Sequence, residues 1–293
     1  MPCYAPLRGY YSRKRTPHGK RSVVFSVREG FVDRRVTVPC GRCIGCRLEY
    51  SRQWAMRCMH EASLHDENCF LTLTYSPEYL PENGSLRKAD FQKFMKRLRA
   101  RYDRDSIRYF HSGEYGSATN RPHYHALLFG FDFADKNYWT QRKGFPVFRS
   151  DVLEKLWPFG QSEIGSVTFE SSAYVSRYIL KKFKGSEDEV RKYYGRREPE
   201  YCTMSRRPGI GREWYEKYKD ELHLHDSVIV GGREFKPARY YDAAFKDVSP
   251  REFAAIRGAR KRARNEEEET DERLEARCKV AEARVKLFAS EEL

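Results

Sequence analysis

Short apolar runs constrain the fold of this chain more than any other feature of its sequence. The longest of them, such as 126–131, extend over about six residues. A bilayer-spanning helix needs about 20 consecutive apolar residues, so we expect no membrane segment. The N-terminus also lacks the apolar stretch of a secretory signal. The chain is nevertheless 293 residues long and 14% aromatic, which favours a sizeable folded core and excludes disorder throughout.

Positive charge is distributed unevenly along the chain. The 56 Lys and Arg residues outnumber the 42 Asp and Glu residues, which gives a net charge of +14. Residues 1–60 contain thirteen basic and three acidic residues, whereas residues 249–293 contain eleven of each. The whole excess therefore lies in residues 1–248, and it predicts a polyanionic partner, most simply nucleic acid.

The C-terminal segment 249–293 is predicted to be a charged tail that is helical or partly disordered. Ser249 before Pro250 is typical of an N-cap followed by proline at the first helical position. Basic 257–264 is followed by acidic 266–272, with few large apolar residues between them. No heptad pattern is sustained, so a coiled coil is not expected.

The pattern of apolar residues between these ends predicts an α+β fold. The expected strands are 69–75, 107–111, 123–129 and 164–169, and the expected helices are 48–65, 91–102, a short helix capped by Asp151, and 172–184. The short connection between the second and third strands favours antiparallel pairing. We therefore expect an antiparallel central sheet flanked by helices, of ferredoxin-like or related character.

Three cysteines lie close together in Cys40-Gly-Arg-Cys43-Ile-Gly-Cys46. A Cys-x2-Cys unit lets two thiolates bind one ion, and a structural zinc site needs four ligands. Cys3 is the preferred fourth ligand because it begins a Pro-bounded segment that could fold back, whereas Cys58 falls on the apolar face of a helix. An iron–sulfur cluster and three reduced thiols are the alternatives.

A His-aromatic-His motif lies on the expected strand 123–129. Alternate side chains of a strand point the same way, so His123 and His125 share one face. Glu114 ends the preceding strand, and its carboxylate approaches the two imidazoles if the strands pair. Two nitrogens and one oxygen suit a catalytic Mg²⁺ or Mn²⁺. The alternative is a pair of solvated or core histidines. A second His-x-His, at 223–225, is expected to be structural.

Two tyrosines and a lysine lie on one face of the expected helix 172–184. Tyr174, Tyr178 and Lys181 are spaced i, i+4 and i+7. A phenol becomes a usable nucleophile where a metal or a cation stabilises the charge that develops on its oxygen. The alternative is an amphipathic helix that packs through its tyrosines.

In combination, these motifs resemble the HUH endonuclease superfamily, and in particular its two-tyrosine rolling-circle replication initiators. Further motifs are similar to those of gokushovirus-type microvirus initiators: the cysteine motif with Cys3, FLTLTY at 70–75, GEYG at 113–116, SRRPGIG at 205–211 and PARYYD at 237–242. The resemblance covers residues 3 to about 245. It implies a basic cysteine-containing segment with a helix (1–66), a nuclease core with an HUH-type sheet (67–188), a Tyr/Arg-rich extension of that core (189–248) and the tail (249–293).

The resemblance also implies roles for individual residues. His123, His125 and Glu114 are the expected ligands of Mg²⁺ or Mn²⁺, Tyr178 and Tyr174 the nucleophiles, and Lys181 a group that neutralises phosphate. The basic residues Arg121, Arg177 and Lys182 are expected to bind DNA. Cys3, Cys40, Cys43 and Cys46 are the candidate structural zinc ligands.

The implied function is a metal-dependent nicking and joining enzyme that starts and terminates rolling-circle replication of phage DNA. It would act in the cytoplasm of a bacterial host, on single-stranded or melted origin DNA, together with host helicase and polymerase. The alternatives are a non-catalytic zinc-containing DNA-binding protein and an HUH relaxase or transposase. The sequence leaves the oligomeric state open.

Overall fold

The structure is a computed structural model that describes residues 3–103, 105–116, 119–142, 144–181, 187–265 and 267–290. For residues 177–181 and 288–290, only the backbone is described. The chain forms two compact units. Unit 1 consists of Met1–Tyr50 and Arg257–Leu293, and unit 2 consists of Ser51–Ile256.

Unit 1 combines the two ends of the chain. Its sheet has the order β2-β1-β3 and is antiparallel, with β1 at Leu7–Ser12, β2 at Val23–Val24 and β3 at Gly30–Val38. Helix α9, Asp271–Ser290, contributes Asp271, whose carboxylate accepts two hydrogen bonds of 2.8 and 3.0 Å from the Arg8 guanidinium. The expected C-terminal helices are therefore present, and the second of them belongs to the same unit as the N-terminal strands.

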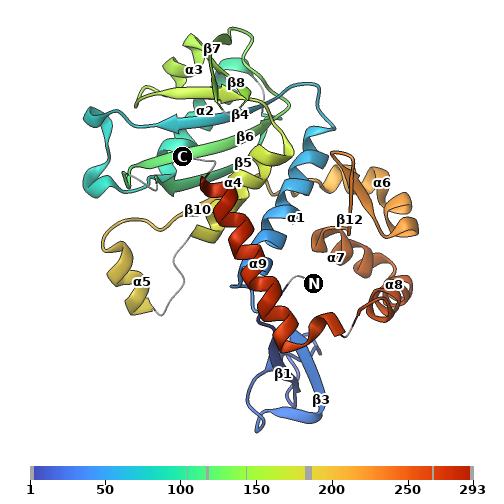
Figure 1. Cartoon of the computed structure of the whole chain (residues 1–293). Coiled ribbons are helices and arrows are strands. Elements are labelled where there is room, and N and C mark those ends of the chain that lie inside the picture. Colours follow the sequence, from blue (N-terminus) through green and yellow to red (C-terminus); the bar gives the residue numbers. More distant parts are fainter. Residues whose placement is uncertain are drawn as a thin grey trace. The chain divides into compact units, whose positions relative to one another are not determined.

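A seven-stranded antiparallel sheet is the centre of unit 2 (Figure 1). Its order is β10-β5-β6-β4-β9-β8-β7. The strands are β4 (Asn68–Thr74), β5 (Arg108–Tyr115), β6 (Pro122–Phe129), β7 (Asn137–Arg142), β8 (Phe145–Arg149), β9 (Ser162–Gly165) and β10 (Tyr201–Met204). The fold is α+β, with a large antiparallel sheet flanked by helices, as the sequence predicts.

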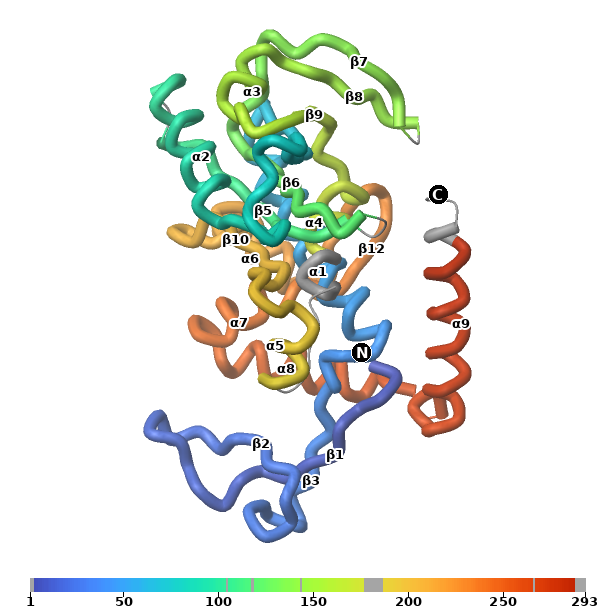
Figure 2. The backbone as a smooth tube through the Cα atoms, turned by 90° about the vertical axis from the view of Figure 1, so that its left-hand side faces the viewer, coloured from blue at the N-terminus to red at the C-terminus, as the bar shows by residue number. Residues whose placement is uncertain are grey.

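Helices pack on both faces of this sheet (Figure 2). On the face that we call the α2 face, α2 (Lys88–Tyr102) and α3 (Asp151–Leu156) cover a core that includes Leu71, Tyr124 and Ala126. On the opposite face, the α4 face, α1 (Ile44–Ala62) and α4 (Phe169–Lys181) pack against the alternate residues of the same strands, which include Phe110 and Leu127. Both sides of the central strands are therefore buried.

The segment after α4 adds a third buried cluster against α1. The cluster is supplied by α6 (Arg212–His225), the hairpin of β11 (Val228–Val230) and β12 (Arg233–Phe235), and α7 (Arg239–Val248). Two further helices of the segment, α5 (Glu187–Tyr194) and α8 (Pro250–Arg262), lie outside it. Met56 of α1 packs with Tyr215 of α6 and Tyr241 of α7 in this cluster. Helix α8 begins at the proline where the sequence predicts a helix start.

Several elements differ from the sequence prediction. Strand β9 ends at Gly165, and α4 starts at Phe169 because Thr168 and Ser171 exchange side-chain-to-backbone hydrogen bonds of 2.8 and 3.1 Å as a capping box. Helix α3 is capped by Ser150 and not by Asp151, since the Ser150 hydroxyl accepts from the backbone N–H of Leu153 at 3.0 Å. The β7–β8 hairpin, β10 and the unit 1 sheet were not predicted.

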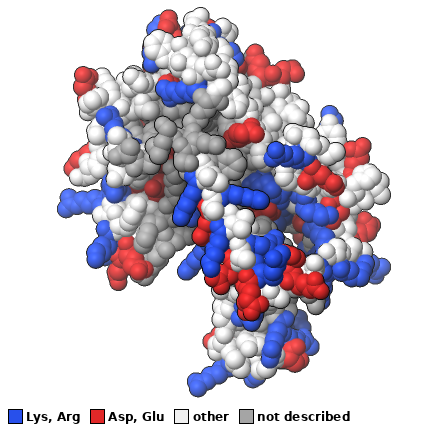
Figure 3. All heavy atoms as spheres, in the orientation of Figure 1, with Lys and Arg blue, Asp and Glu red and all other residues white. Residues whose placement is uncertain are grey.

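Charged side chains of both signs occur over the face of the molecule drawn in Figure 3. Lys and Arg appear in several separate places there, with acidic side chains among them. Among the helices of the described residues, none has both the length and the apolar character that a bilayer crossing requires.

Candidate active site

Glu114, His123 and His125 converge on the α4 face of the central strands. Strands β5 and β6 pair so that Glu114 lies opposite His123 and Ser112 opposite His125. Oε1 of Glu114 lies 2.6 Å from Nε2 of His123 and 3.1 Å from Nε2 of His125. The candidate ligand atoms all lie within 4.8 Å of one another. The structure thus brings together the three residues that the sequence singled out.

Burial and hydrogen bonds set the state of the carboxylate. Glu114 is 1% exposed. Burial raises the pKa of Glu114, but hydrogen bonds from His123 and His125 outweigh this effect and hold the pKa below its ordinary value. The carboxylate is therefore ionised at neutral pH and available as an oxygen ligand.

Neighbouring groups orient the two imidazoles. Nδ1 of His123 lies 3.1 Å from the carbonyl oxygen of Arg121, and Nδ1 of His125 lies 3.1 Å from the hydroxyl of Thr72. The ring of Phe70 also stacks on His125, with centroids 5.6 Å apart. These contacts leave both Nε2 atoms directed at the shared carboxylate, as hydrogen bonds at the other ring nitrogen do for metal-binding histidines. This donor set of two imidazoles and one carboxylate fits a divalent cation.

Tyr174 is the tyrosine of the motif whose side chain the structure describes, and it lies next to His125. Its ring meets His125 edge to face, with centroids 5.1 Å apart and an interplanar angle of 79°. Helix α4, which carries it, contacts β5, β6 and β10. One candidate nucleophile therefore contacts His125, one of the three candidate metal ligands.

Two serines hold α4 against α1. The Ser51 hydroxyl donates to the carbonyl oxygen of Ala173 at 2.8 Å and lies 3.0 Å from the hydroxyl of Ser176. Val175 lies between Ala173 and Ser176 on α4, and its side chain is fully buried with Phe110 and Leu127. These contacts fix the rotation of α4 about its axis, and with it the position of Tyr174.

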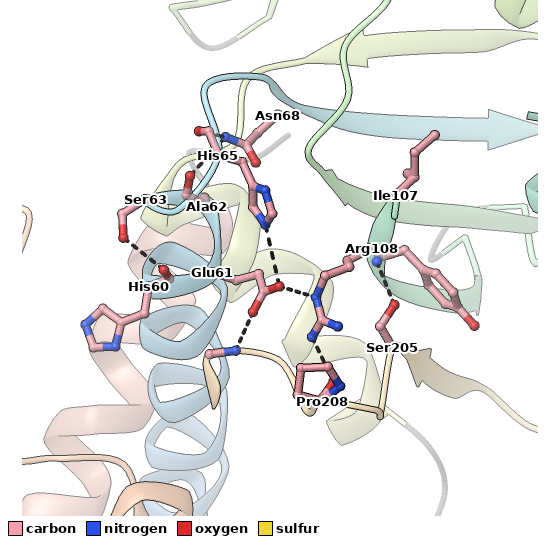
Figure 4. A network of polar contacts seen from close by, with 12 residues as sticks. His60, Glu61, Ala62, Ser63, His65, Asn68, Ile107, Arg108, Ser205 and Pro208 are labelled. Atoms are coloured by element: carbon pink, nitrogen blue, oxygen red, sulfur yellow. Dashed lines mark hydrogen bonds and ion pairs between the residues drawn. The ribbon is translucent and has the colours of Figure 1, made fainter. Parts of the chain in front are cut away.

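A buried acidic residue on α1 fixes the start of β5, the strand that ends in Glu114 (Figure 4). The Glu61 carboxylate, 1% exposed, accepts from Nε of Arg108 and, at 2.6 Å, from the backbone N–H of Gly211. Arg108 also donates to the carbonyl oxygen of Pro208 at 2.8 Å. Helix α1, β5 and the 205–211 loop are therefore joined through one carboxylate.

Other predicted site residues are placed only in part. The structure describes only the backbone of three of them, which lie on α4: Arg177, Tyr178 and Lys181. Lys182 lies wholly outside them. Arg121 donates to the carbonyl oxygen of Tyr75 at 2.8 Å and so links the end of β4 to the start of β6.

The second His-x-His motif differs in structure from the first. His223 and His225 lie on α6 and not on a strand, so their side chains diverge. His223 is buried and stacks on Phe245 with centroids 3.6 Å apart, whereas His225 is exposed. They form no shared pair of ligands.

The four candidate zinc ligands of unit 1 also converge. The sulfur atoms of Cys3, Cys40, Cys43 and Cys46 lie within 4.8 Å of one another. Backbone N–H groups point at three of the sulfurs: that of Cys40 at Cys3, that of Tyr4 at Cys43, and those of Arg42 and Cys43 at Cys40, at 3.3 to 3.4 Å. Cys58 is buried elsewhere, against the sheet of unit 2.

The backbone around this cluster favours a thiolate at Cys43. Burial raises the pKa of Cys43, but hydrogen bonds from the backbone N–H groups of Cys46 and Tyr4 outweigh it and lower the pKa to about 7. Burial raises the pKa of Cys3 and of Cys46. Four sulfurs around one point, with one of them readily ionised, fit a tetrahedral thiophilic ion.

Sequence reasoning missed the residues that support the site. Thr72, which contacts His125, alternates with buried Leu71 and Leu73, so the pattern of the strand could have placed it on the histidine side. Glu61 and Arg108 are separated by 47 positions, and no local pattern links them.

Comparisons with known proteins agree with these motifs. A family model described as replication-associated protein ORF2/G2P matches residues 68–183, which run from β4 through α4. The chain is 37% identical to the replication-associated protein VP4 of Bdellovibrio phage phiMH2K, over 73% of this chain and 69% of that protein. It is 33% identical to the replication-associated protein ORF2 of Spiroplasma virus 4, over 70% and 67%. For the replication-associated protein ORF4 of Chlamydia phage 1, the identity is 29% over 72% and 53%. No solved structure matches the chain.

Proposed function

The chain belongs to the family of phage replication-associated proteins, and from this premise we propose that it is a replication initiator that nicks and rejoins single-stranded origin DNA through a phosphotyrosine bond. The resemblance to microvirus initiators that the sequence motifs carry is confirmed by these relatives. The nicking chemistry is inferred from the residues of the candidate site.

One observation carries the proposal. The phenol ring of Tyr174 packs against His125, and His125 shares the carboxylate of Glu114 with His123. A nucleophile beside a preformed set of metal ligands is the arrangement that phosphoryl transfer to a protein side chain needs. A DNA-binding protein without catalysis does not require this arrangement.

The tyrosine oxygen would attack the scissile phosphorus in line. A new oxygen–phosphorus bond forms to the protein as the phenol loses its proton. The bond to the 3′ oxygen breaks and that oxygen takes up a proton, which leaves a 3′-hydroxyl and a 5′-phosphotyrosine. The free 3′ end would prime synthesis. Because the phosphodiester energy is kept in the protein–DNA bond, rejoining requires no ATP.

His123, His125 and Glu114 would hold Mg²⁺ or Mn²⁺. Such an ion supplies Lewis-acid polarisation of a phosphate oxygen and a template for the strand. Thr72 and the Arg121 carbonyl would keep the two imidazoles turned toward it.

Two tyrosines on α4 suit a reaction with two cleavages. We propose that Tyr178 and Tyr174 alternate, the second cutting the regenerated origin after one circuit of synthesis. The new 3′-hydroxyl then attacks the first phosphotyrosine and closes a single-stranded circle. Lys181 would neutralise phosphate, and Arg121, Arg177 and Lys182 would bind DNA.

The cysteine cluster would hold a structural zinc ion. Zinc bound by Cys3, Cys40, Cys43 and Cys46 would tie the N-terminus to the first turn of α1. It would stabilise unit 1 and take no part in the cleavage.

The reaction would take place in the cytoplasm of the host cell. Host helicase and polymerase are the proposed partners, because a nick supplies only a primer and a strand end.

A single incubation tests the proposal. The protein is mixed with a single-stranded oligonucleotide of its origin and Mn²⁺, and the products are separated on a denaturing gel. A covalent protein–DNA adduct is expected, and it should be absent from the double variant Tyr174→Phe, Tyr178→Phe. Undiminished cleavage by the double variant contradicts the mechanism. Binding without any adduct from the wild type would favour the non-catalytic DNA-binding alternative.

A further inference from the structure

The β7–β8 hairpin exposes aromatic side chains at the edge of the seven-stranded sheet. Tyr138 is 65% exposed, Trp139 53% and Phe145 50%. The hairpin pairs with the rest of the sheet through one registered pair, Phe148 with Ile164 of β9. The proposed cleavage chemistry uses none of these residues, so their exposure calls for a separate explanation.

The register assigns each hairpin residue to a face. Phe148 lies opposite Ile164, Ile164 opposite Leu71, and all three contribute to the core of the α2 face. Because side chains alternate along a strand, Phe145 and Arg149 point to the α4 face.

The two exposed aromatic residues of β7 therefore point to opposite faces. The guanidinium of Arg149 lies over the indole of Trp139 at 3.8 Å from the ring centroid, which puts Trp139 on the α4 face. The ring of Tyr138 packs edge-on against Phe148, with centroids 6.2 Å apart, on the α2 face. The chain thus offers a matched pair of neighbouring exposed rings.

The α4 face connects the hairpin to the histidine cluster. His125 lies opposite Thr72 of β4, and Thr72 lies opposite Glu163 of β9. Arg142 of β7 donates to both oxygens of Glu163, at 2.7 and 2.8 Å, from the same face. With neighbouring strands about 4.8 Å apart, β8 lies about 14 Å from β6 across this face. A polymer bound at the histidine cluster can therefore reach the hairpin with only a few of its monomer units.

The charge of the hairpin fits a polyanion. Residues 137–149 contain Arg142, Lys143 and Arg149 and no acidic residue. Arg142 is already paired with Glu163 of β9. Within the described residues, Arg149 forms no ion pair, and its Nε atom is buried without a hydrogen-bond partner. An exposed indole backed by an arginine is a surface on which a nucleic-acid base can stack without regard to sequence.

We propose that Trp139, supported by Arg149, is a stacking platform for a base of the single-stranded DNA that crosses the α4 face between the histidine cluster and the β7–β8 hairpin. This inference rests on the proposed function for the identity of the strand. It goes beyond that function in assigning a binding surface outside the residues that would perform the cleavage.

Binding is measured without cleavage. The background is the Tyr174→Phe, Tyr178→Phe protein in EDTA, and the readout is the fluorescence anisotropy of a fluorescein-labelled single-stranded DNA of mixed sequence. Trp139→Ala should raise the Kd about tenfold, within the range of stacking losses, and Trp139→Phe should keep most of the affinity. Tyr138→Ala, the neighbouring exposed ring on the other face, should leave the Kd unchanged.

Two results would overturn the platform. The first is a Kd for Trp139→Ala that equals the Kd for Tyr138→Ala. The second concerns a single-stranded RNA of the same sequence. The platform for DNA is refuted if the protein binds this RNA more tightly than the DNA and if Trp139→Ala weakens the binding of the RNA but not that of the DNA. Because no cleavage is required, a wild type that forms no covalent adduct but depends on Trp139 for binding would refute the proposed chemistry and leave the platform standing.

Discussion

Nε2 of His123 lies 2.6 Å from Oε1 of Glu114, across the antiparallel pair formed by β6 and β5. Residues nine positions apart are brought into contact by a strand, a turn and a second strand. His125, two residues further along β6, reaches the same oxygen at 3.1 Å. One carboxylate oxygen is thus the meeting point of both imidazoles.

Replacing Glu114 by Gln should abolish tight binding of Mn²⁺. The amide keeps the size of the side chain but removes the negative charge that a divalent cation needs. We expect a loss of Mn²⁺ affinity and of nicking of about 100-fold or more. Isothermal titration with Mn²⁺ and a nicking assay measure the two losses. His225→Ala, an exposed histidine of the other His-x-His motif, is the control and should change neither; wild-type Mn²⁺ affinity in Glu114→Gln would refute the assignment.

The two tyrosines should separate the two cleavages. Tyr178→Phe should abolish or redirect the covalent adduct, whereas Tyr174→Phe should spare the first nick and impair closure of the circle. The readout is the adduct on a denaturing gel, together with circular product from a substrate with two origins. Tyr11→Phe, on a strand of unit 1, serves as the control. Full circle closure by Tyr174→Phe would rule out alternation.

Removing the charge of Glu61 should destabilise unit 2. The carboxylate compensates Arg108, whose side chain is only 13% exposed, so Glu61→Ala leaves a buried cation unpaired. We expect a loss of about 3–5 kcal/mol in the free energy of unfolding, measured by urea denaturation.

The exposed ion pair of Lys88 and Glu198 provides the comparison, because both side chains are more than 40% exposed. Glu198→Ala should cost less than about 1 kcal/mol. The double variant Glu61→Leu, Arg108→Met should recover part of the loss, since it leaves no buried charge. Equal losses for the two glutamate variants would contradict the role of burial.

Acid should destabilise the protein through His60. Burial lowers the pKa of His60 to about 3, from 6.5 in an ordinary setting. Between these pH values the unfolded chain binds a proton that the folded protein does not, so the free energy of unfolding falls as the pH is lowered from about 6.5 toward 3. The His60 contribution to this slope is at most about 1.4 kcal/mol per pH unit.

His60→Phe keeps a ring to stack on Trp214, 3.5 Å away, and removes the titrating group. Urea unfolding at a series of pH values should show a shallower fall in stability for this variant. His18→Phe, at an exposed position, should follow the wild type. If His60→Phe retained the full slope, proton binding at His60 would not be its source.

Cobalt should report on the cysteine cluster. Protein reconstituted with Co²⁺ should show the intense absorption of a tetrahedral tetrathiolate site, and Cys46→Ser should change it. Cys58→Ser should not, because Cys58 lies in the core of unit 2. Metal analysis of the purified protein should find zinc. Finding iron with its visible absorption would select the cluster alternative, and finding neither metal would refute the site.

The part of the site that follows strand alternation could be predicted from the sequence. His123 and His125 share a face because the strand has a period of two, and Glu114 follows once the turn between the strands is recognised. The alternation in 123–129 also placed Tyr124 away from the cluster, and its hydroxyl lies 2.8 Å from that of Tyr75 on the α2 face.

Other elements depend on interactions that no short segment shows. Residues 164–169 are rich in β-branched and aromatic side chains, so propensity favoured a strand, whereas the Thr168–Ser171 capping box starts α4 within it. Five of the six residues of β7 are exposed, so this strand lacks the apolar alternation that marks a half-buried strand. The pairing of Arg8 with Asp271 joins positions 263 apart.

The contact between Arg8 and Asp271 can form only after most of the chain has been synthesised. The first strands leave the ribosome early, but α9, which completes unit 1, follows only after the roughly 200 residues of unit 2. At about 5–20 residues per second, the interval is roughly 10–40 s. Unit 2, with its histidine cluster, can therefore fold before the N-terminal sheet acquires its last partner, and a chain truncated after residue 256 would contain all of unit 2 but only the N-terminal part of unit 1.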